Sequence, residues 1–214
     1  MVQICINKEN FIIKFADDTN LIIPAEFVHT CNEEIQNVKL WAIKNNLTLN
    51  ETKTKEIVFR NPRTRFNLNM MPLQTPMLNN RKSVFKILGV TFTDTFSMND
   101  RINNILSSCS QALYAMKILK SKGLNNEVLQ VIFKSTILSR LLYASQAWYG
   151  FLNYSERQRL EAFLRKSKKL LYAPDDLQMF SELCENNDDT LFCNVSCNSN
   201  HVLASLLPVK KELT

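Results

Sequence analysis

The stretch Phe15-Ala16-Asp17-Asp18 decides how the fold is interpreted, because it sets two adjacent carboxylates between two apolar runs. Phe11-Ile12-Ile13 precedes it and Leu21-Ile22-Ile23 follows it. Apolar runs on both sides of a short polar segment are typical of a β-hairpin, with the polar residues at the turn. We therefore expect a hairpin with residues 17–20 at or near its tip.

The acidic pair at this tip is a candidate metal site. Asp17 and Asp18 offer carboxylate oxygens, which are the ligands that a hard cation such as Mg²⁺ prefers. Acidic pairs are also common in turns because they hydrogen-bond the local backbone, so a solvated turn is the alternative. Segments later in the chain help to decide between a metal site and a solvated turn.

Three of those segments follow the hairpin directly. Thr30 and Glu33 form a capping-box pattern, and apolar residues including Trp41 then recur at helical spacing to about Asn46. The motif Asn-x-Leu-x-Leu-Asn-x-x-Lys-Thr occupies residues 45–54. Glu56-Ile57-Val58-Phe59 then predicts a strand.

This order of segments resembles the reverse transcriptases of LINE-type (non-LTR, Jockey-like) retrotransposons, which are RNA-directed DNA polymerases. The segments are the hairpin, the Trp-bearing helix, the motif at residues 45–54 and the strand that follows it. In that family the first Asp of the pair binds metal, so the resemblance makes Asp17 the ligand and Asp18 the accessory carboxylate. Two metal ions in such nucleotidyltransferases activate the attacking 3′-oxygen and stabilise the leaving pyrophosphate. Lys53 lies where the family places a lysine near the nucleotide phosphates. It is thus a candidate proton donor, with a solvated loop lysine as the alternative.

A second β-rich segment runs from Val84 to Phe92 and is interrupted by Gly89. Its aromatic-Lys-x-Leu-Gly-Val pattern resembles the hairpin of the same family that grips the primer end. The resemblance makes Lys86 and Gly89 candidate nucleic-acid contacts. The alternative is a structural strand whose glycine marks a bulge.

Three helices are predicted after this segment. The first is opened by Ser97 and closed by Gly123, the second runs from Asn126 to near Gly150, and the third is capped by Ser155 and ends before Pro174. The second is apolar nearly all round, which predicts the buried member of a bundle. Together they resemble the thumb region of Jockey-like elements, although the family usually has Trp and His near the positions of Met98 and Arg101.

Charge is unevenly distributed along the chain. Residues 1–174 hold 24 Lys and Arg against 13 Asp and Glu, whereas residues 175–214 hold 2 against 7, which gives the net charge of +6. A basic body favours a polyanionic partner, whose phosphates lysine and arginine would neutralise. The candidate contacts on the third helix are Arg157, Arg165, Lys166, Lys168 and Lys169. A solvated basic face is the alternative.

The family's active site needs more than this hairpin supplies. A third carboxylate comes from a strand well before the hairpin, and nucleotide-binding fingers also precede it, whereas Glu9 is the only acidic residue before Phe15. We therefore expect Mg²⁺ only with a complete active site, and no polymerisation by this chain alone. A rival metal site, a Cys₃His zinc site on Cys193, Cys197 and His201 with Cys184 upstream, has a spacing that fits the usual zinc motifs poorly.

We expect an α+β fold, a truncated polymerase palm of antiparallel strands and a packed helix followed by a helical thumb. Residues 1–96 would form the partial palm with the primer-grip-like strands, 97–174 the thumb-like bundle, and 175–214 an acidic C-terminal tail. The expected partners are an RNA template and a DNA primer, with deoxynucleotides in the full-length parent. The alternatives are a non-enzymatic nucleic-acid-binding remnant and a pseudogene fragment that does not fold stably.

No stretch approaches the roughly 20 apolar residues of a membrane span. We expect an intracellular protein without membrane contact, in the nucleus or the cytoplasm.

Overall fold

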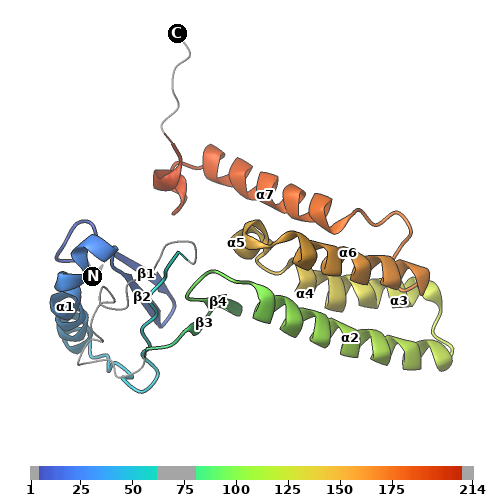
Figure 1. Ribbon diagram of the computed structural model, residues 1–214, viewed down its shortest axis with the longest axis horizontal. Helices are drawn as coiled ribbons and strands as arrows, with labels where there is room; N and C mark the ends of the chain where they lie inside the picture. Colours follow the sequence, from blue (N-terminus) through green and yellow to red (C-terminus); the bar gives the residue numbers. More distant parts are fainter. Residues whose placement is uncertain (1–4, 62–80, 209–214) are drawn as a thin grey trace, which may run out of the picture. The chain divides into compact units, whose positions relative to one another are not determined.

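A computed structural model of the chain describes residues 5–61 and 81–208 and confirms the expected α+β class (Figure 1). Two units divide the chain, Met1–Phe85 and Lys86–Thr214, with the boundary inside strand β3. In the described residues no helix is long and apolar enough to cross a membrane. The finer division expected at residues 96 and 174 stays a prediction.

The N-terminal hairpin forms as expected, but its turn is tighter. Strand β1 (Phe11–Phe15) pairs with β2 (Asp18–Ile22) in antiparallel register, from Phe11 opposite Ile22 to Phe15 opposite Asp18. Only residues 16 and 17 lie between the strands, so residues 18–20, expected at or near the tip, belong to β2. The positive φ of Ala16 (51°) is the backbone conformation that two-residue hairpin turns require.

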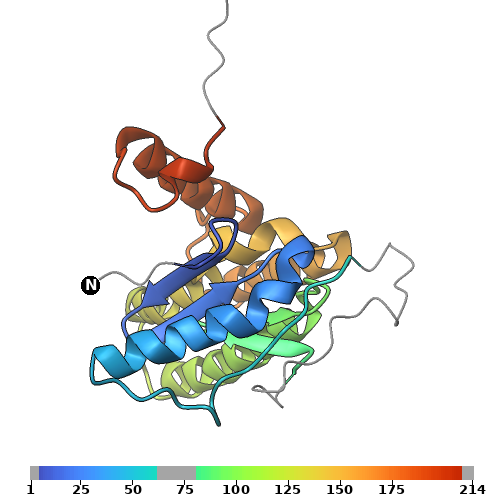
Figure 2. The same cartoon turned by 90° about the vertical axis from the view of Figure 1, so that its left-hand side faces the viewer.

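A single helix lies alongside this hairpin (Figure 2). After a short 3₁₀ segment, η1 (Ala25–Thr30), helix α1 runs over Cys31–Lys44, close to the range expected from sequence. Lys14 of β1 places its Nζ 3.2 Å from the centroid of the Trp41 ring on α1. This cation–π contact ties strand to helix.

Glu34 joins α1 to the segment before the hairpin. Its fully buried carboxylate accepts hydrogen bonds from the backbone N–H groups of Ile6 (3.1 Å) and Asn7 (2.8 Å) and from the side chain of Asn10 (3.0 Å). Burial alone would raise the pKa of Glu34, but the hydrogen bonds outweigh it and lower the pKa below the ordinary value of 4.5. The carboxylate therefore stabilises the first unit in its charged form.

Glu34→Gln is expected to destabilise the first unit by about 1–3 kcal/mol, because an amide NH₂ would face donors that now bond to a carboxylate oxygen. Because the folded pKa lies below 4.5, the contribution is fully present above the unfolded pKa and is lost as pH falls through the folded pKa. Denaturant unfolding of both proteins from pH 7 to pH 3 checks this. A difference in unfolding free energy between the two proteins that stayed constant down to pH 3 would contradict this prediction.

The first unit buries little apolar surface in the described residues. Its buried hydrophobic residues are Ile35 and Ala42. On the face of β1 that does not carry Lys14, the side chains of Phe11, Ile13 and Phe15 are 53%, 55% and 61% exposed. A two-stranded sheet with one open apolar face is marginally stable in water.

The second unit has a continuous core. Its elements are β3 (Val84–Ile87, which begins in the first unit), β4 (Val90–Thr93), α2 (Asn99–Ser121), α3 (Asn126–Ile132), the π-helical η3 (Phe133–Leu138), α4 (Ser139–Leu142), α5 (Ser145–Trp148), η4 (Tyr149–Phe151), α6 (Tyr154–Lys169), α7 (Phe180–Cys197) and η5 (Ala204–Leu206). Fully buried side chains from four segments meet in it, among them Ile102, Phe133, Trp148 and Leu160.

Several expected boundaries are wrong. Helix α2 has Met98 rather than Ser97 at its N-cap, and α6 begins after Asn153, which forms a capping box with Glu156. The strand expected over residues 56–59 is reduced to one bridge between Glu56 and Arg81. Asn153 and Glu156 are a local capping pattern that competes with Ser155 for the start of α6, whereas Met98 makes no side-chain cap hydrogen bond.

Two larger differences concern the helices. The helix expected from Asn126 to near Gly150 breaks after Leu142, where Ala144 has a φ of 52°. In the segment expected to be an acidic tail, α7 packs against α5 and α6 and buries Phe180 and Cys184 in the core. The acidic residues of α7, which are Glu182, Glu185, Asp188 and Asp189, are exposed.

Candidate functional site

The two candidate metal ligands lie at the tip of the β1–β2 hairpin. Asp17 is the second turn residue and Asp18 the first residue of β2, and both side chains are exposed. Ala16, immediately before them, is held in the left-handed region, which costs a non-glycine residue about 1–2 kcal/mol. Such strain is concentrated at functional sites and persists only where the surrounding structure enforces it.

The donor chemistry at this tip fits Mg²⁺, since both side chains are carboxylates. A two-metal site needs further oxygen ligands, because two adjacent carboxylates cannot fill two coordination spheres. Among the described residues no group of three or more His, Cys, Asp or Glu side chains could hold a metal ion. The zinc site considered at Cys193, Cys197 and His201 is therefore not assembled in this part of the chain.

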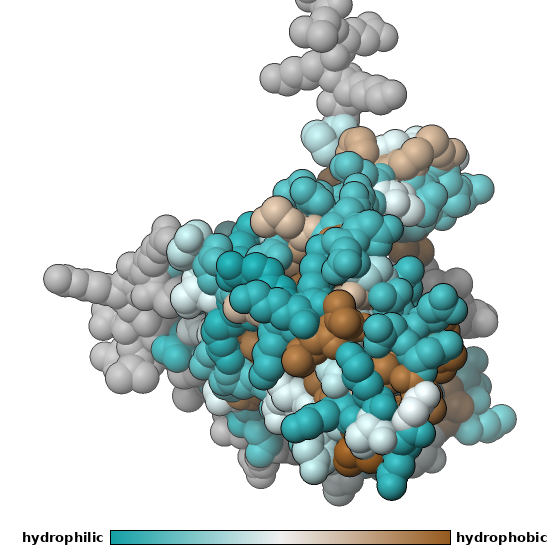
Figure 3. Space-filling view, turned by 90° about the vertical axis from the view of Figure 1, so that its right-hand side faces the viewer, coloured by the Kyte–Doolittle hydropathy of each residue, from teal (hydrophilic) through white to brown (hydrophobic). Residues whose placement is uncertain are grey.

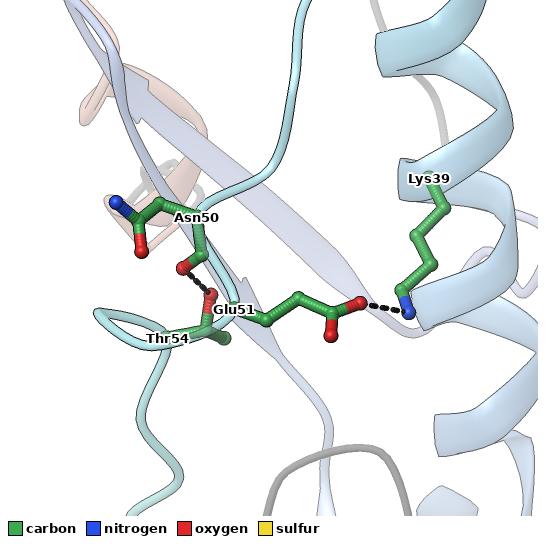
Figure 4. A network of polar contacts seen from close by, with 4 residues as sticks. All are labelled: Lys39, Asn50, Glu51 and Thr54. Carbon is green, nitrogen blue, oxygen red and sulfur yellow. Dashed lines mark hydrogen bonds and ion pairs between the residues drawn. The ribbon is translucent and has the colours of Figure 1, made fainter.

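Lys53 has an exposed side chain and lies in a turn, of which Figure 4 shows Asn50, Glu51 and Thr54. Asn50 organises this turn, because its side chain accepts from the Lys53 N–H (3.1 Å) and its carbonyl accepts from the Thr54 hydroxyl (2.9 Å). Glu51 forms an ion pair with Lys39 of α1 (2.5 Å), which fixes the turn to the helix. In the described residues no hydrogen bond or ion pair joins Lys53 to the carboxylates.

The second candidate element is a hairpin, not a bulged strand. Strands β3 and β4 pair through a two-residue turn, in which Leu88 and Gly89 have φ values of 46° and 85°. Tyr143 packs over this turn: its hydroxyl donates to the Leu88 carbonyl (2.8 Å), and a Cβ at position 89 would lie 3.4 Å from its ring. Lys86 is exposed on β3.

Arg101 of α2 also holds the β3–β4 turn in place. Its buried guanidinium donates to the carbonyls of Gly89 (3.2 Å) and Tyr143 (3.0 Å) and lies 4.9 Å from the Trp148 ring centroid. The Trp148 Nε1–H also donates to the Tyr143 carbonyl (3.0 Å). In a continuing helix the Tyr143 carbonyl would accept a hydrogen bond from a backbone N–H of the next turn. Arg101 and Trp148 donate to it instead, which explains the break after Leu142.

Burial lowers the pKa of Arg101 from its ordinary value, because desolvation disfavours the charged form. In the described residues its partners are carbonyls and a ring, with no carboxylate. Sequence reasoning noted Arg101 only as a departure from the family. The Leu-Gly turn belongs to the primer-grip-like pattern, and Arg101 connects it to the Tyr143 carbonyl at the helix break.

Gly89→Ala is expected to destabilise the second unit by about 1–2 kcal/mol, because alanine at this positive φ is strained. Gly150→Ala is the matched control, since no atom lies within 4 Å of a Cβ there. Denaturant unfolding followed by circular dichroism at 222 nm, which reports mainly on the helices of the second unit, measures both. Equal effects of the two substitutions would contradict this role of the turn.

Cationic side chains gather at one end of the helical unit. Arg159 donates to Asn103 near the start of α2 (2.6 Å), and Lys120 donates to the Leu170 carbonyl just past the end of α6 (3.3 Å). Helices α2 and α6 therefore run side by side in the same direction (Figure 1). The cations near their C-terminal ends, which we call the basic end, are Lys117, Lys120, Lys122, Arg165, Lys166, Lys168 and Lys169.

Figure 3 faces this end of the helical unit and shows hydrophilic side chains around an apolar patch. Arg165, Lys166 and Lys169 are exposed there. Lys168 instead donates to the carbonyls of Asp175 and Leu177, and Arg157 stacks on Tyr149 (4.6 Å), so both are held by contacts within the chain. Sequence reasoning missed Lys117 and Lys120 of α2 and Lys122 at its C-cap, because it could not show that the two helices are parallel.

Comparison with family models, with curated proteins and with solved structures finds no match to this chain. The function proposed below therefore depends on the local geometry and on the resemblance in sequence.

Proposed function

We propose that this chain is the palm-and-thumb part of an RNA-directed DNA polymerase of the LINE type. Asp17 and Asp18 would be its metal carboxylates, Lys53 its phosphate-side acid, and Lys86 and Gly89 its primer support. The observation that carries the proposal is the pair of exposed carboxylates at a strained two-residue turn, on a hairpin joined to a helix. A divalent metal would supply activation of the primer 3′-oxygen.

The open surface of the first unit supports a shared active site. Phe11, Ile13 and Phe15 expose one face of a two-stranded sheet, and Asp18 shares that face because it lies opposite Phe15. An added strand or segment would cover this apolar surface and could bring a further carboxylate to the same edge. The chain alone is therefore proposed to be inactive.

A second candidate function is nucleic-acid binding without catalysis, and the basic end favours it. Its exposed lysines and arginines can neutralise phosphates without reading sequence. Cations near helix C-termini also interact favourably with the helix dipole, so the charge alone does not establish a binding site. Binding and catalysis must therefore be measured separately.

The test combines primer extension with binding. The chain is given a primed RNA template, deoxynucleotides and Mg²⁺, and its affinity for the same template is measured across a salt series. We expect binding that weakens steeply with salt and no incorporation. Incorporation that Asp17→Asn abolishes would overturn the inactivity of the chain alone, and no binding at low salt would overturn both functions.

The genomic DNA upstream of this reading frame distinguishes the two candidates further. We expect a frame, continuous or shifted, that encodes nucleotide-binding fingers and a third carboxylate. An unrelated promoter and start would argue for a separate gene and against a broken element.

A further inference from the structure

The six cysteines of the chain fall into distinct environments, and one pair stands apart. Cys109 and Cys184 are fully buried, and burial raises the pKa of their thiols to about 11 and about 12. Cys5 and Cys31 are partly buried. Cys193 and Cys197 are both exposed on the last turns of α7, and their Sγ atoms are 3.9 Å apart.

This spacing suits a bridging atom better than a direct disulfide. Residues four apart on a helix have Cβ atoms about 5–6 Å apart. A disulfide needs Cβ atoms about 3.5–4.5 Å apart and sulfurs at about 2.05 Å. Closing the bond between Cys193 and Cys197 would therefore distort the end of α7, whereas an atom held between the sulfurs would leave the helix intact.

We propose that Cys193 and Cys197 form a two-thiolate site for one soft cation of the Cu(I) class. Thiolates are the ligands that select soft cations, and an exposed pair on one helix face chelates without rearrangement. On binding, each thiol releases its proton to solvent and forms one bond from sulfur to the metal. The resulting bis-thiolate Cu(I) unit carries a single negative charge.

Neighbouring groups are consistent with a two-ligand site. His201 uses Nδ1 to accept the Leu203 N–H (3.1 Å), so that nitrogen is engaged. In the described part of the chain the sulfur pair belongs to no larger cluster of potential metal ligands.

The test is an anaerobic titration of the reduced full chain with Cu(I), in competition with a chromogenic Cu(I) chelator. We expect one Cu(I) per chain, with affinity lowered on the order of 100-fold or more by Cys193→Ser or Cys197→Ser, because chelation is lost. Cys31→Ser is the matched control and should leave the affinity unchanged. Circular dichroism of each variant confirms that the helices persist.

Three results would overturn the site. The first is a Cu(I) affinity that neither serine substitution changes. The second is equal affinity for the chain unfolded in guanidinium, since the helix would then contribute nothing. The third is tighter binding of Zn²⁺ than of Cu(I) in a parallel titration, which would assign the pair to a four-ligand metal.

Discussion

Trp148→Ala is expected to destabilise the second unit by about 3–5 kcal/mol, the range for deleting a fully buried aromatic side chain. The Trp148 ring stacks on Phe180 of α7 (6.4 Å between centroids) and lies beside the Arg101 guanidinium. Its Nε1–H also holds the Tyr143 carbonyl at the helix break. One substitution therefore loosens α7 and the support of the β3–β4 turn together.

Urea unfolding followed by circular dichroism at 222 nm measures this effect, because most helical residues belong to the second unit. Trp41→Ala is the matched control: Trp41 is only partly buried and contacts Lys14 in the first unit. The control should leave the main helical transition within about 0.5 kcal/mol of the unsubstituted chain. Equal losses from both substitutions would mean that the units do not unfold separately.

Neutralising the basic end is expected to have the largest effect on nucleic-acid binding. A variant with Lys117, Arg165, Lys166 and Lys169 all changed to Gln removes four exposed cations. If each contacts a phosphate, the slope of log K against log salt concentration falls by about 3–4 units for a duplex. The loss should be similar for unrelated sequences, because phosphate contacts carry no sequence information.

Lys8→Gln with Lys134→Gln serves as the control, since both lysines are exposed and lie outside the basic end. Fluorescence anisotropy with a labelled primed template at several salt concentrations measures both variants. If the slope fell by the same amount per removed charge in the control, the loss of binding would be a general effect of net charge. An unchanged slope in the four-site variant would place phosphate binding elsewhere.

Local patterns predicted much of the secondary structure. The apolar runs around residues 15–18 specified the hairpin, and the spacing to Trp41 specified α1. Gly123 ended α2 as expected, with a φ of 94°. These features depend on neighbours within a few residues, which is the range over which periodicity and capping act.

The features that the sequence did not predict depend on contacts between residues far apart in the chain. The helix break at Tyr143 depends on Arg101, 42 positions earlier, and no glycine or proline marks it. Helix α7 was missed because its acidic residues suggested a tail, whereas Phe180 and Cys184 anchor it in the core. The α2 lysines of the basic end become visible only once α2 and α6 are seen to be parallel.

The resemblance to reverse transcriptases remains a proposal, and it depends on metal binding at one turn. Mn²⁺ is a suitable probe, because it prefers the oxygen ligands that Mg²⁺ uses and broadens the NMR signals of nearby amides. Asp175 and Asp176 provide an internal control, as an adjacent exposed acidic pair outside the hairpin. The experiment uses the full chain bound to a primed template, so that phosphate oxygens can add to the two carboxylates. Partial Mn²⁺ occupancy is enough to broaden nearby amide signals, whereas stable loading with Mg²⁺ is expected only with a complete active site.

Titration with Mn²⁺ should broaden the amide signals of residues 16–19 first, and Asp17→Asn should abolish that broadening. The amides of Asp175 and Asp176 should respond only at higher Mn²⁺ concentration. Broadening that is equal at the two acidic pairs, or that survives Asp17→Asn, would contradict a metal site at the hairpin tip.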